Sequence, residues 1–406
     1  MLKIGIIRER KQPSDARAPL TPAQCASVQA LWPVQVVVEP SPVRAFKDAE
    51  YTQLGIALQE DLSDCDVLLG VKEVPDAHLI PNKTYLFFSH TIKKQAYNRH
   101  LLQTVLEKKI RLIDYEVLTD ERGDRLIAFG FYAGVVGAHN GIWAYGQRTG
   151  AYTLPRMYAA HDYAEVKKAY PTTAWPPLRI VLTGSGRVAA GAMRNLHDMD
   201  IHQVSPRDFL HKTYDKPVFT QLFAHDYVQH HAGIRVFDKA HYYKNGAEYV
   251  STFAPFYRSA DIFINGIFYD PSAPKFFTQS EMRQADFALQ VIADVSCDIA
   301  PDASVPCTLR PSTIADPVYG FDPNTGQETR AFQKEAIDVM AIDNLPSELP
   351  RDASDFFGKQ LMDNILPELL KGTESAVIQR GMIAEDGHLT ESFLYLRDYV
   401  FESVPV

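Results

Sequence analysis

Two ionisable side chains directly follow short apolar runs of this chain. Lys72 follows the run Asp66–Val71, and His90 follows Tyr85–Ser89. Lysine and histidine are the side chains whose pKa values are most easily brought near neutrality, so the pair could accept and donate protons. If each run is a buried strand, both groups lie at the carboxyl edge of an α/β sheet, where ligands bind. The pair therefore predicts a site for proton transfer.

Further charged residues lie near the expected strand ends and loops of the same region. Arg17 and Arg125 are suited to bidentate binding of carboxylates, whereas Glu73 and Glu116 are suited to an ammonium group or could hold Lys72 in place. Lys93 adds another cation to this set. Each charged residue taken alone is more simply a solvated surface group. Their grouping at strand ends predicts a site for a zwitterion that carries several carboxylates.

A glycine-rich turn predicts a second site, for a dinucleotide. The apolar run Arg179–Thr183 is followed by GSGRVAAGA and then by a helical pattern that continues through Leu196. In such a turn the glycines let the backbone approach a pyrophosphate, and the helix directs free N–H groups at the phosphates. Ala189 replaces the third glycine of the usual fingerprint, which is a permitted change. The residues expected to contact the nucleotide are Gly184, Ser185, Gly186, Arg187, Val188, Ser205, Arg207, Asn265, Gly266 and Asp294.

The segment after the next expected strand bears on the choice of cofactor. It reads Gln203-Val204-Ser205-Pro206-Arg207 and has no acid where the ribose 2′-hydroxyl is usually held. Ser205 and Arg207 could instead receive a 2′-phosphate. Asp208 follows directly and weakens this distinction. We therefore expect NADP or NAD as cofactor, with NADP slightly favoured.

Alternating strands and helices must position these residues. Such alternation predicts parallel sheets covered by helices on both faces. A helix is expected from Thr21, which caps it, and another over 92–108; the long Gly- and Ala-rich helix at 128–150 is expected to bridge two domains. Apolar runs predict strands at 3–7, 36–38, 63–71, 85–88, 110–114, 179–183, 262–266, 291–295 and 338–342. The segment 207–260 is interpreted as surface helix and loop, and its histidine spacing matches no standard metal-ligand pattern, so no metal is expected.

The composition limits the class of protein. A chain of 406 residues, 46% of them hydrophobic, predicts two domains, and a net charge of −9 argues against nucleic acid as a partner. Four cysteines without a paired spacing predict free thiols in a reducing compartment. No apolar stretch approaches the roughly 20 residues that span a bilayer. We expect a cytoplasmic protein without a membrane partner, whose oligomeric state stays open.

Nine motifs along the chain resemble those of one enzyme family. They are SDARAPLTP, LLGVKEVP, YLFFSHTIKKQ, RLIDYE, AFGFYAGVVGA, VLTGSGRVAAGA, DIFINGIFY, VIADVSCDIA and AIDNLPSELPRDASDFFG. Their pattern looks like that of the lysine-forming saccharopine dehydrogenases and of the lysine–2-oxoglutarate reductase domain of the animal and plant bifunctional enzyme. A more distant likeness is to alanine dehydrogenase and the transhydrogenase α chain. The resemblance implies two Rossmann-like domains flanking a cleft: a substrate domain at 1–133 and 346–406, and a dinucleotide-binding domain at 134–345.

The resemblance also implies a reaction. The ε-amine of lysine condenses with the keto group of 2-oxoglutarate, and a nicotinamide hydride reduces the imine to saccharopine, reversibly. The acid–base pair of the family matches Lys72 of GVKE and His90 of FFSH, and such a pair contributes roughly 10²–10⁴-fold in rate. Substrate contacts or tuning of the pair are implied for Arg17, Glu73, Lys93, Glu116, Arg125 and Asp343.

Two other functions remain open at this point. One is a related amino-acid dehydrogenase acting on alanine or an opine, and the other is a nucleotide-binding regulator without catalysis. The intact pair of Lys72 and His90 argues against the regulator. The Ser205-Pro206-Arg207 segment departs from the acid of the fungal NAD-dependent members and is nearer to the NADPH-using reductase domain. The 406 residues also lack the glutamate-forming domain of the bifunctional enzyme, so we expect the chain to act alone or with a separate partner.

Overall fold

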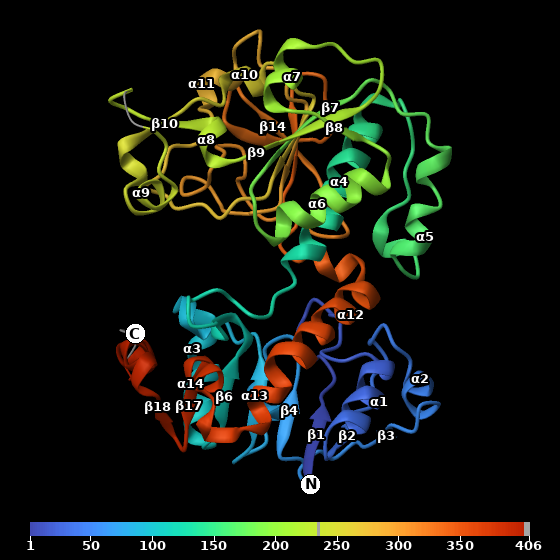
Figure 1. Cartoon of the computed structure of the whole chain (residues 1–406), viewed down its shortest axis with the longest axis vertical. Coiled ribbons are helices and arrows are strands. Elements are labelled where there is room, and N and C mark those ends of the chain that lie inside the picture. Colours follow the sequence, from blue (N-terminus) through green and yellow to red (C-terminus); the bar gives the residue numbers. More distant parts are fainter. Residues whose placement is uncertain (234–235, 402–406) are drawn as a thin grey trace. The chain divides into compact units, whose positions relative to one another are not determined.

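The chain folds into two compact units. The computed structural model describes residues 1–233 and 236–401. The first unit contains the chain up to Phe129 and the segment from Pro350 onward, and the second unit is Gly130–Leu349. The compact units change after Phe129 and after Leu349, whereas the domain boundaries expected after residues 133 and 345 stay predictions. In Figure 1 the first unit therefore contains both ends of the colour scale, blue and red.

The first unit is built on an eight-stranded sheet with the order β18-β17-β6-β5-β4-β1-β2-β3. Strands β1 to β6 are parallel, whereas β17 and β18 are antiparallel additions. The parallel part has the Rossmann order, so the α/β prediction is confirmed for this unit. The strands are β1 (Leu2–Ile6), β2 (Val34–Val38), β3 (Ala57–Leu58), β4 (Val67–Leu69), β5 (Thr84–Phe87), β6 (Arg111–Asp114), β17 (Met382–Glu385) and β18 (His388–Leu389).

One helix of the first unit begins where the sequence predicted, and another begins later than predicted. Helix α1 begins after Thr21, whose hydroxyl accepts the Gln24 N–H while Gln24 accepts the Thr21 N–H, as the capping pattern predicts. The helix expected over 92–108 begins only at Arg99, because short 3₁₀ turns and a left-handed Lys94 (φ 52°) precede it. The helices are α1 (Pro22–Leu31), α2 (Asp48–Thr52), α3 (Arg99–Glu107), α12 (Pro350–Gln360), α13 (Leu366–Leu370), α14 (Ala376–Gly381) and α15 (Arg397–Phe401).

The second unit has its own eight-stranded sheet, with the order β15-β14-β16-β13-β12-β7-β9-β8. All of its strands are parallel except β14 and β15, which confirms the α/β prediction here too. The expectation of surface helix and loop for 207–260 is wrong, because β9 lies within the sheet, where four of its five residues are buried. The strands are β7 (Arg179–Thr183), β8 (His202–Gln203), β9 (Val218–Leu222), β12 (Ile262–Asn265), β13 (Val291–Asp294), β14 (Tyr319–Asp322), β15 (Gln327–Thr329) and β16 (Ile337–Met340); β10 (Val228–His230) and β11 (Tyr249–Ser251) form a separate pair.

Two helices of the second unit approach each other closely. Helix α4 (Gly130–Thr149), which lies wholly in this unit, packs on α6 (Arg187–Asp198). A Cβ atom on Gly134 would lie 1.9 Å from the Val188 oxygen, and one on Gly191 would lie 1.8 Å from the Phe131 oxygen. The glycines of this long helix are therefore packing positions. The remaining helices are α5 (Tyr163–Lys167), α7 (Pro206–His211), α8 (Ala224–Tyr227), α9 (Lys239–Lys244), α10 (Ala254–Tyr257) and α11 (Gln279–Met282).

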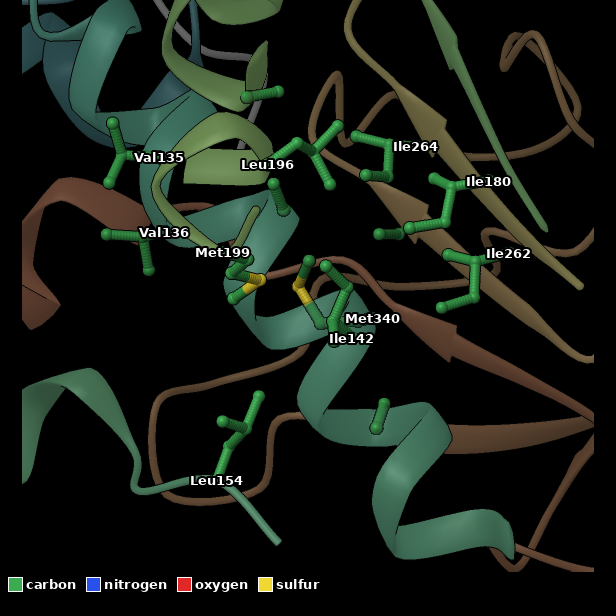
Figure 2. Packing of buried hydrophobic residues seen from close by; sticks show 14 of the residues in the cluster. Val135, Val136, Ile142, Leu154, Ile180, Leu196, Met199, Ile262, Ile264 and Met340 are labelled. Carbon is green, nitrogen blue, oxygen red and sulfur yellow. The ribbon is translucent and has the colours of Figure 1, made fainter. Parts of the chain in front are cut away.

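The core of the second unit lies between these helices and the sheet. Figure 2 shows side chains of α4 and α6 meeting those of the central strands; the buried residues labelled there include Val135, Ile142, Leu196, Ile180, Ile262 and Ile264. Burial of aliphatic side chains of this size stabilises a fold by roughly 1.5–3 kcal/mol each. This core holds the start of α6 against the end of β7, where the glycine-rich turn lies. Within the described residues, no helix is long and apolar enough to cross a membrane.

Candidate active site

Three neighbouring strands of the first unit deliver the predicted site residues to one edge of its sheet. Strands β4, β5 and β6 are adjacent and parallel, so their carboxyl ends lie at the same edge. Lys72 follows β4, His90 follows β5 and Glu116 follows β6. The sheet thus brings together residues that are far apart in the sequence.

His90 and Glu73 are joined by a hydrogen bond. His90 Nδ1 lies 2.7 Å from Glu73 Oε1, and Lys11 Nζ lies 2.7 Å from Glu73 Oε2. Burial acts to raise the pKa of Glu73, but the contacts with His90 and Lys11 outweigh it and lower the pKa to about 2. The carboxylate therefore stays ionised and orients the imidazole, whose Nε2 is the atom left to exchange protons. Lys11 was not expected from the sequence.

Lys72 lies beside this pair with its charge poorly stabilised. Burial and the neighbouring Arg17 lower the pKa of its ammonium, against the opposing effect of Asp15 and Glu73. Neither a hydrogen bond nor an ion pair reaches Lys72 Nζ from any described residue of the chain. A lysine in this state releases its proton more readily than a solvated one, which suits a general base.

Glu9 holds the backbone at Lys72 and was missed from the sequence. Its two carboxylate oxygens accept the N–H groups of Val71 (2.7 Å) and Lys72 (2.9 Å). Burial and the nearby Asp15 raise the pKa of Glu9 to about 7, although the two backbone hydrogen bonds act to lower it. Glu9 follows β1, which pairs with β4, so two central strands cooperate in placing Lys72.

The raised pKa of Glu9 predicts a pH dependence of stability. Between the ordinary value near 4.5 and about 7, the folded state retains a proton that the unfolded state has released. This contribution, on the order of 1–3 kcal/mol, is complete below about pH 4.5 and is lost as the pH rises through 7. Glu9→Gln, which has no proton to release, should lack it. Urea unfolding of both proteins at about pH 5 and about pH 8 measures the difference, and an identical pH response would contradict the assignment.

Arg17 is buried close enough to Lys72 to lower the pKa of its ammonium. Its Nε and Nη2 atoms contact the two Asp15 oxygens at 3.0 and 2.6 Å, and the guanidinium lies 4.2 Å from the centre of the Phe129 ring. Burial acts to raise the pKa of Asp15, but the charge and hydrogen bonds of Arg17 lower it well below its usual range. Arg17 is thus held rigidly by Asp15, and it also contributes to the positive potential at Lys72.

The two remaining cations predicted for the site, Lys93 and Arg125, both contact Glu116. Lys93 Nζ lies 3.4 Å and Arg125 Nη2 lies 3.2 Å from Glu116 Oε1. Asp114, which the sequence did not single out, is fully buried; it accepts the Glu116 N–H (2.7 Å) and both the N–H (3.0 Å) and hydroxyl of Ser89. Asp114 therefore ties the loop after β6 to the loop that carries His90.

The glycine-rich turn of the second unit has the geometry of a phosphate-binding loop. Gly184 has φ +109°, and a Cβ there would lie 2.5 Å from the Gly266 oxygen, so this position requires glycine. A Cβ on Gly186 would meet no atom within 4 Å, which leaves open space beside the first turn of α6. Ser185, Gly186 and Arg187 are exposed, whereas Val188 is partly buried. The exposed backbone and the N-terminus of the 12-residue helix fit the pyrophosphate of a dinucleotide.

Other expected nucleotide contacts are buried. Asn265 donates to Asp294 Oδ1 and Ser304 Oγ, both at 2.8 Å, and Thr308 donates to Asp294 Oδ2 at 2.6 Å. Burial raises the pKa of Asp294 to about 6. These two side chains connect β12 and β13 internally, so they support the sheet edge rather than reach its surface. Asp343, in contrast, is exposed just after β16.

The slight preference for NADP assumed that Ser205 and Arg207 follow the strand next to the glycine-rich turn, and this assumption is wrong. The strand beside β7 is β9, and β8 lies beyond it at the edge of the sheet. Ser205 and Arg207 follow β8; the Ser205 hydroxyl caps α7 by accepting the Asp208 N–H at 3.1 Å. They therefore do not lie at the end of the strand next to the glycine-rich turn. The order of the strands could not be read from the sequence.

Two histidines of the 207–260 segment lie close to the carboxylate of Glu248. His230 Nε2 lies 3.1 Å and His241 Nε2 lies 3.8 Å from Glu248 Oε2. Over the described part of the chain, no group of three or more His, Cys, Asp or Glu side chains is placed to hold a metal ion. Cys25, Cys65, Cys297 and Cys307 are free thiols.

Comparison with known proteins identifies relatives over most of the chain. Residues 5–136 match the family model "Alanine dehydrogenase/PNT, N-terminal domain". Alpha-aminoadipic semialdehyde synthase is 30% identical over 452 residues in Rattus norvegicus and 27% over 448 in Arabidopsis thaliana, with 97% of this chain and 47% and 41% of those proteins covered. Saccharopine dehydrogenase [NAD(+), L-lysine-forming] of Emericella nidulans is 29% identical, with 91% of this chain and 92% of that protein covered. The chain spans about half the length of the semialdehyde synthases it matches.

Solved structures support the fold. An L-alanine dehydrogenase matches with a TM-score of 0.65 and 16% identity, covering 98% of this chain and all of that chain. A transhydrogenase from Sinorhizobium meliloti matches with a TM-score of 0.58 and 13% identity, covering 96% of this chain and all of that chain. The resemblance inferred from the motifs is confirmed. The chain is therefore similar over most of its length to lysine-forming saccharopine dehydrogenases and to alpha-aminoadipic semialdehyde synthases, and residues 5–136 match the N-terminal domain of the alanine dehydrogenase/PNT family.

Proposed function

We propose that this chain catalyses the reversible reductive amination of 2-oxoglutarate by the ε-amine of lysine, with a reduced nicotinamide dinucleotide, to give saccharopine. The observation that carries the proposal is the placement of Lys72 and His90 after adjacent strands, with Glu73 bonded to the imidazole. Two relatives that the chain covers to 92% and 90% of their length are named saccharopine dehydrogenase [NAD(+), L-lysine-forming], which supports the proposal. A cytoplasmic location is part of the proposal and is supported by the four free thiols.

The acid–base pair supplies the proton transfers that imine formation requires. Lysine must lose an ammonium proton before its nitrogen attacks the keto carbon, and the carbinolamine oxygen must gain a proton before it leaves as water. Lys72, whose pKa is lowered, is suited to take the first proton. His90 Nε2 is suited to give the second, because Nδ1 is held by Glu73. Proton transfers of this kind contribute roughly 10²–10⁴-fold in rate.

The surrounding cations match the charge of the substrates. 2-Oxoglutarate carries two carboxylates and saccharopine carries three, so the site needs fixed positive charge in a chain of net charge −9. Lys11, Arg17, Lys93 and Arg125 all lie at this edge of the first unit, each beside a carboxylate. Those carboxylates hold the cations in place and moderate their charge. A guanidinium group can bind a carboxylate through two parallel hydrogen bonds, as Arg17 binds Asp15.

The glycine-rich turn of the second unit is assigned to the nicotinamide dinucleotide. When bound, the reduced nicotinamide supplies the hydride that converts the imine to an amine. Gly184 and Gly186 let the backbone approach the pyrophosphate, and the N-terminus of α6 faces its charge. Ser205 and Arg207 give no support to NADP, because they follow the edge strand β8.

Gly186→Val is expected to separate nucleotide binding from folding. Its Cβ would meet no atom of the chain within 4 Å, so the fold should remain, whereas the added side chain occupies the space for the pyrophosphate. The Kd for the reduced nucleotide should rise by about tenfold or more, which corresponds to about 1.4 kcal/mol. Fluorescence titration measures the Kd and circular dichroism checks the fold. An unchanged Kd in a folded variant would contradict the position of the site.

The proposed reaction is tested by its substrate requirement. Oxidation of NADH or NADPH, followed by absorbance, should require both lysine and 2-oxoglutarate. Pyruvate with ammonia should give no oxidation, because it is the pair that an alanine dehydrogenase would use. Turnover with pyruvate and ammonia but not with lysine and 2-oxoglutarate would overturn the proposal. Nucleotide binding without turnover of any amino acid would support a regulator instead.

A further inference from the structure

We propose that the segment Phe223–Asp226, directly after β9, contacts the 2′ position of the adenosine ribose, and that Asp226 there selects NAD over NADP. This inference rests on the proposed use of a nicotinamide dinucleotide by the glycine-rich turn. It concerns which nucleotide is preferred and is independent of the amino-acid substrate. It replaces Ser205 and Arg207, which the sequence placed in this role.

The topology of the second sheet identifies the segment. In a dinucleotide-binding sheet the adenosine ribose lies over the end of the strand adjacent to the one that enters the glycine-rich turn. The entering strand is β7, and all five residues of β9 pair with it in parallel, from Arg179 with Val218 to Thr183 with Leu222. Two hydrogen bonds tie the end of β9 to the turn: Gly184 N–H to Leu222 O (3.1 Å) and Gln221 Nε2 to Gly184 O (2.8 Å).

The segment after β8 lies one strand farther away. His202 and Gln203 of β8 pair with Val218 and Phe219 of β9, and β8 is the edge strand of the sheet. Neighbouring strands are about 4.8 Å apart, so the end of β8 lies about 10 Å from β7. Arg207 is therefore placed away from the glycine-rich turn, although it follows α6 more closely in the sequence. Because β9 lies between β7 and β8, the segment after β9 lies next to the glycine-rich turn and the segment after β8 does not.

The groups after β9 suit a ribose diol. Asp226 Oδ2 accepts the Phe223 N–H at 2.8 Å, and Asp226 Oδ1 lies 3.6 Å from His225 Nε2. The Asp226 side chain is 18% exposed, so the carboxylate is fixed but still reachable. A fixed carboxylate accepts a hydrogen bond from a 2′-hydroxyl and repels a 2′-phosphate. From Phe223 to Gly233 the chain contains no lysine or arginine that would bind that phosphate.

The aromatic pair of the segment adds an exposed flat surface. Phe223 and His225 are stacked with ring centres 5.8 Å apart and planes 5° from parallel. Phe223 is 41% exposed and the His225 side chain is 57% exposed. Base–aromatic stacking is a common way to hold a purine. The segment thus offers a carboxylate for the ribose and a ring surface for the base.

The test compares the Kd values for NADH and NADPH in four proteins, by fluorescence titration that needs no turnover. The wild type should bind NADH at least tenfold more tightly than NADPH. Asp226→Asn should reduce this preference about tenfold, whereas Arg207→Ala should leave it within twofold. Asp208→Asn is the matched control, because it removes a carboxylate after the edge strand.

Each outcome decides the proposal. A preference that changes in Arg207→Ala but not in Asp226→Asn would overturn it, as would a wild type that binds NADPH more tightly. Because Asp226 also caps α8, His225→Arg serves as a second variant if Asp226→Asn does not fold. The added guanidinium should tighten NADPH binding about tenfold and leave NADH nearly unchanged. Failure of the proposed reaction alone would leave these Kd values as they are, so the two failures can be told apart.

Discussion

Lys72→Met is expected to lower kcat by about 10²–10⁴-fold, because it removes the group suited to take the proton from the substrate amine. His90→Gln should have a loss in the same range, since glutamine cannot exchange a proton at the position of Nε2. The Kd for the reduced nucleotide should stay nearly unchanged in both variants, because both residues lie in the first unit and the glycine-rich turn lies in the second. Steady-state kinetics and fluorescence titration measure the two quantities.

A matched control separates chemistry from general damage to the sheet. Lys83→Met changes a lysine directly before β5, at the opposite edge of the same sheet. It should leave kcat within about twofold. Unaltered turnover in Lys72→Met and His90→Gln would remove both residues from the acid–base role. An equal loss in Lys83→Met would show that the effect is not specific to the carboxyl edge.

Gly191→Ala is expected to be strongly destabilising. The added Cβ would lie 1.8 Å from the Phe131 oxygen and 3.0 Å from the Val135 nitrogen, so α4 and α6 would have to move apart. Overpacking of this kind costs typically 1–3 kcal/mol, and the upper end is expected here because both contacts are backbone atoms. Urea unfolding measures the loss. Ala190→Ser, an exposed neighbour on the same helix, is the control and should change the free energy of unfolding by less than about 0.5 kcal/mol.

The sequence predicted the carboxyl edge of the first sheet well. Short apolar runs ending in a charged residue gave the positions of β4, β5 and β6, and parallel pairing then brought Lys72, His90 and Glu116 to one edge. Helix α4 was also predicted closely, because a long run of small residues without proline has few alternatives. Local pattern was sufficient in both cases.

The sequence could not supply contacts between distant segments. Glu9 lies in a run of charged residues that resembles a solvated surface, and its role depends on amides 62 and 63 residues away. The contact of Lys11 with Glu73 spans 62 residues in the same way. Asp114 looked like the end of a strand and is instead a buried link between two loops. These contacts depend on the order of the strands in the sheet, and a local sequence pattern does not contain that order.

In the second unit, too, local features were predicted and contacts between distant segments were not. The motif at Gly184–Gly186 was recognisable because the turn chemistry is local, and the turn lies where it was expected, between β7 and α6. The partner strand was misassigned because β9 lies in a segment rich in tyrosine and histidine, which looked like surface. Asn265 and Asp294 were expected to contact the nucleotide, which stays a prediction, and the hydrogen bond that joins their buried side chains was not foreseen.

Identification of the product tests the proposed reaction of lysine with 2-oxoglutarate. The protein is supplied with lysine, 2-oxoglutarate and reduced nicotinamide dinucleotide in which both hydrogens at C4 of the nicotinamide are deuterium, and the products are analysed by mass spectrometry. We expect saccharopine with one deuterium, formed in equal amount to the nucleotide oxidised, and a rate that falls about 10²-fold or more in Lys72→Met. Oxidation of the nucleotide without saccharopine, or deuterium recovered only in another amino acid, would contradict the proposed reaction.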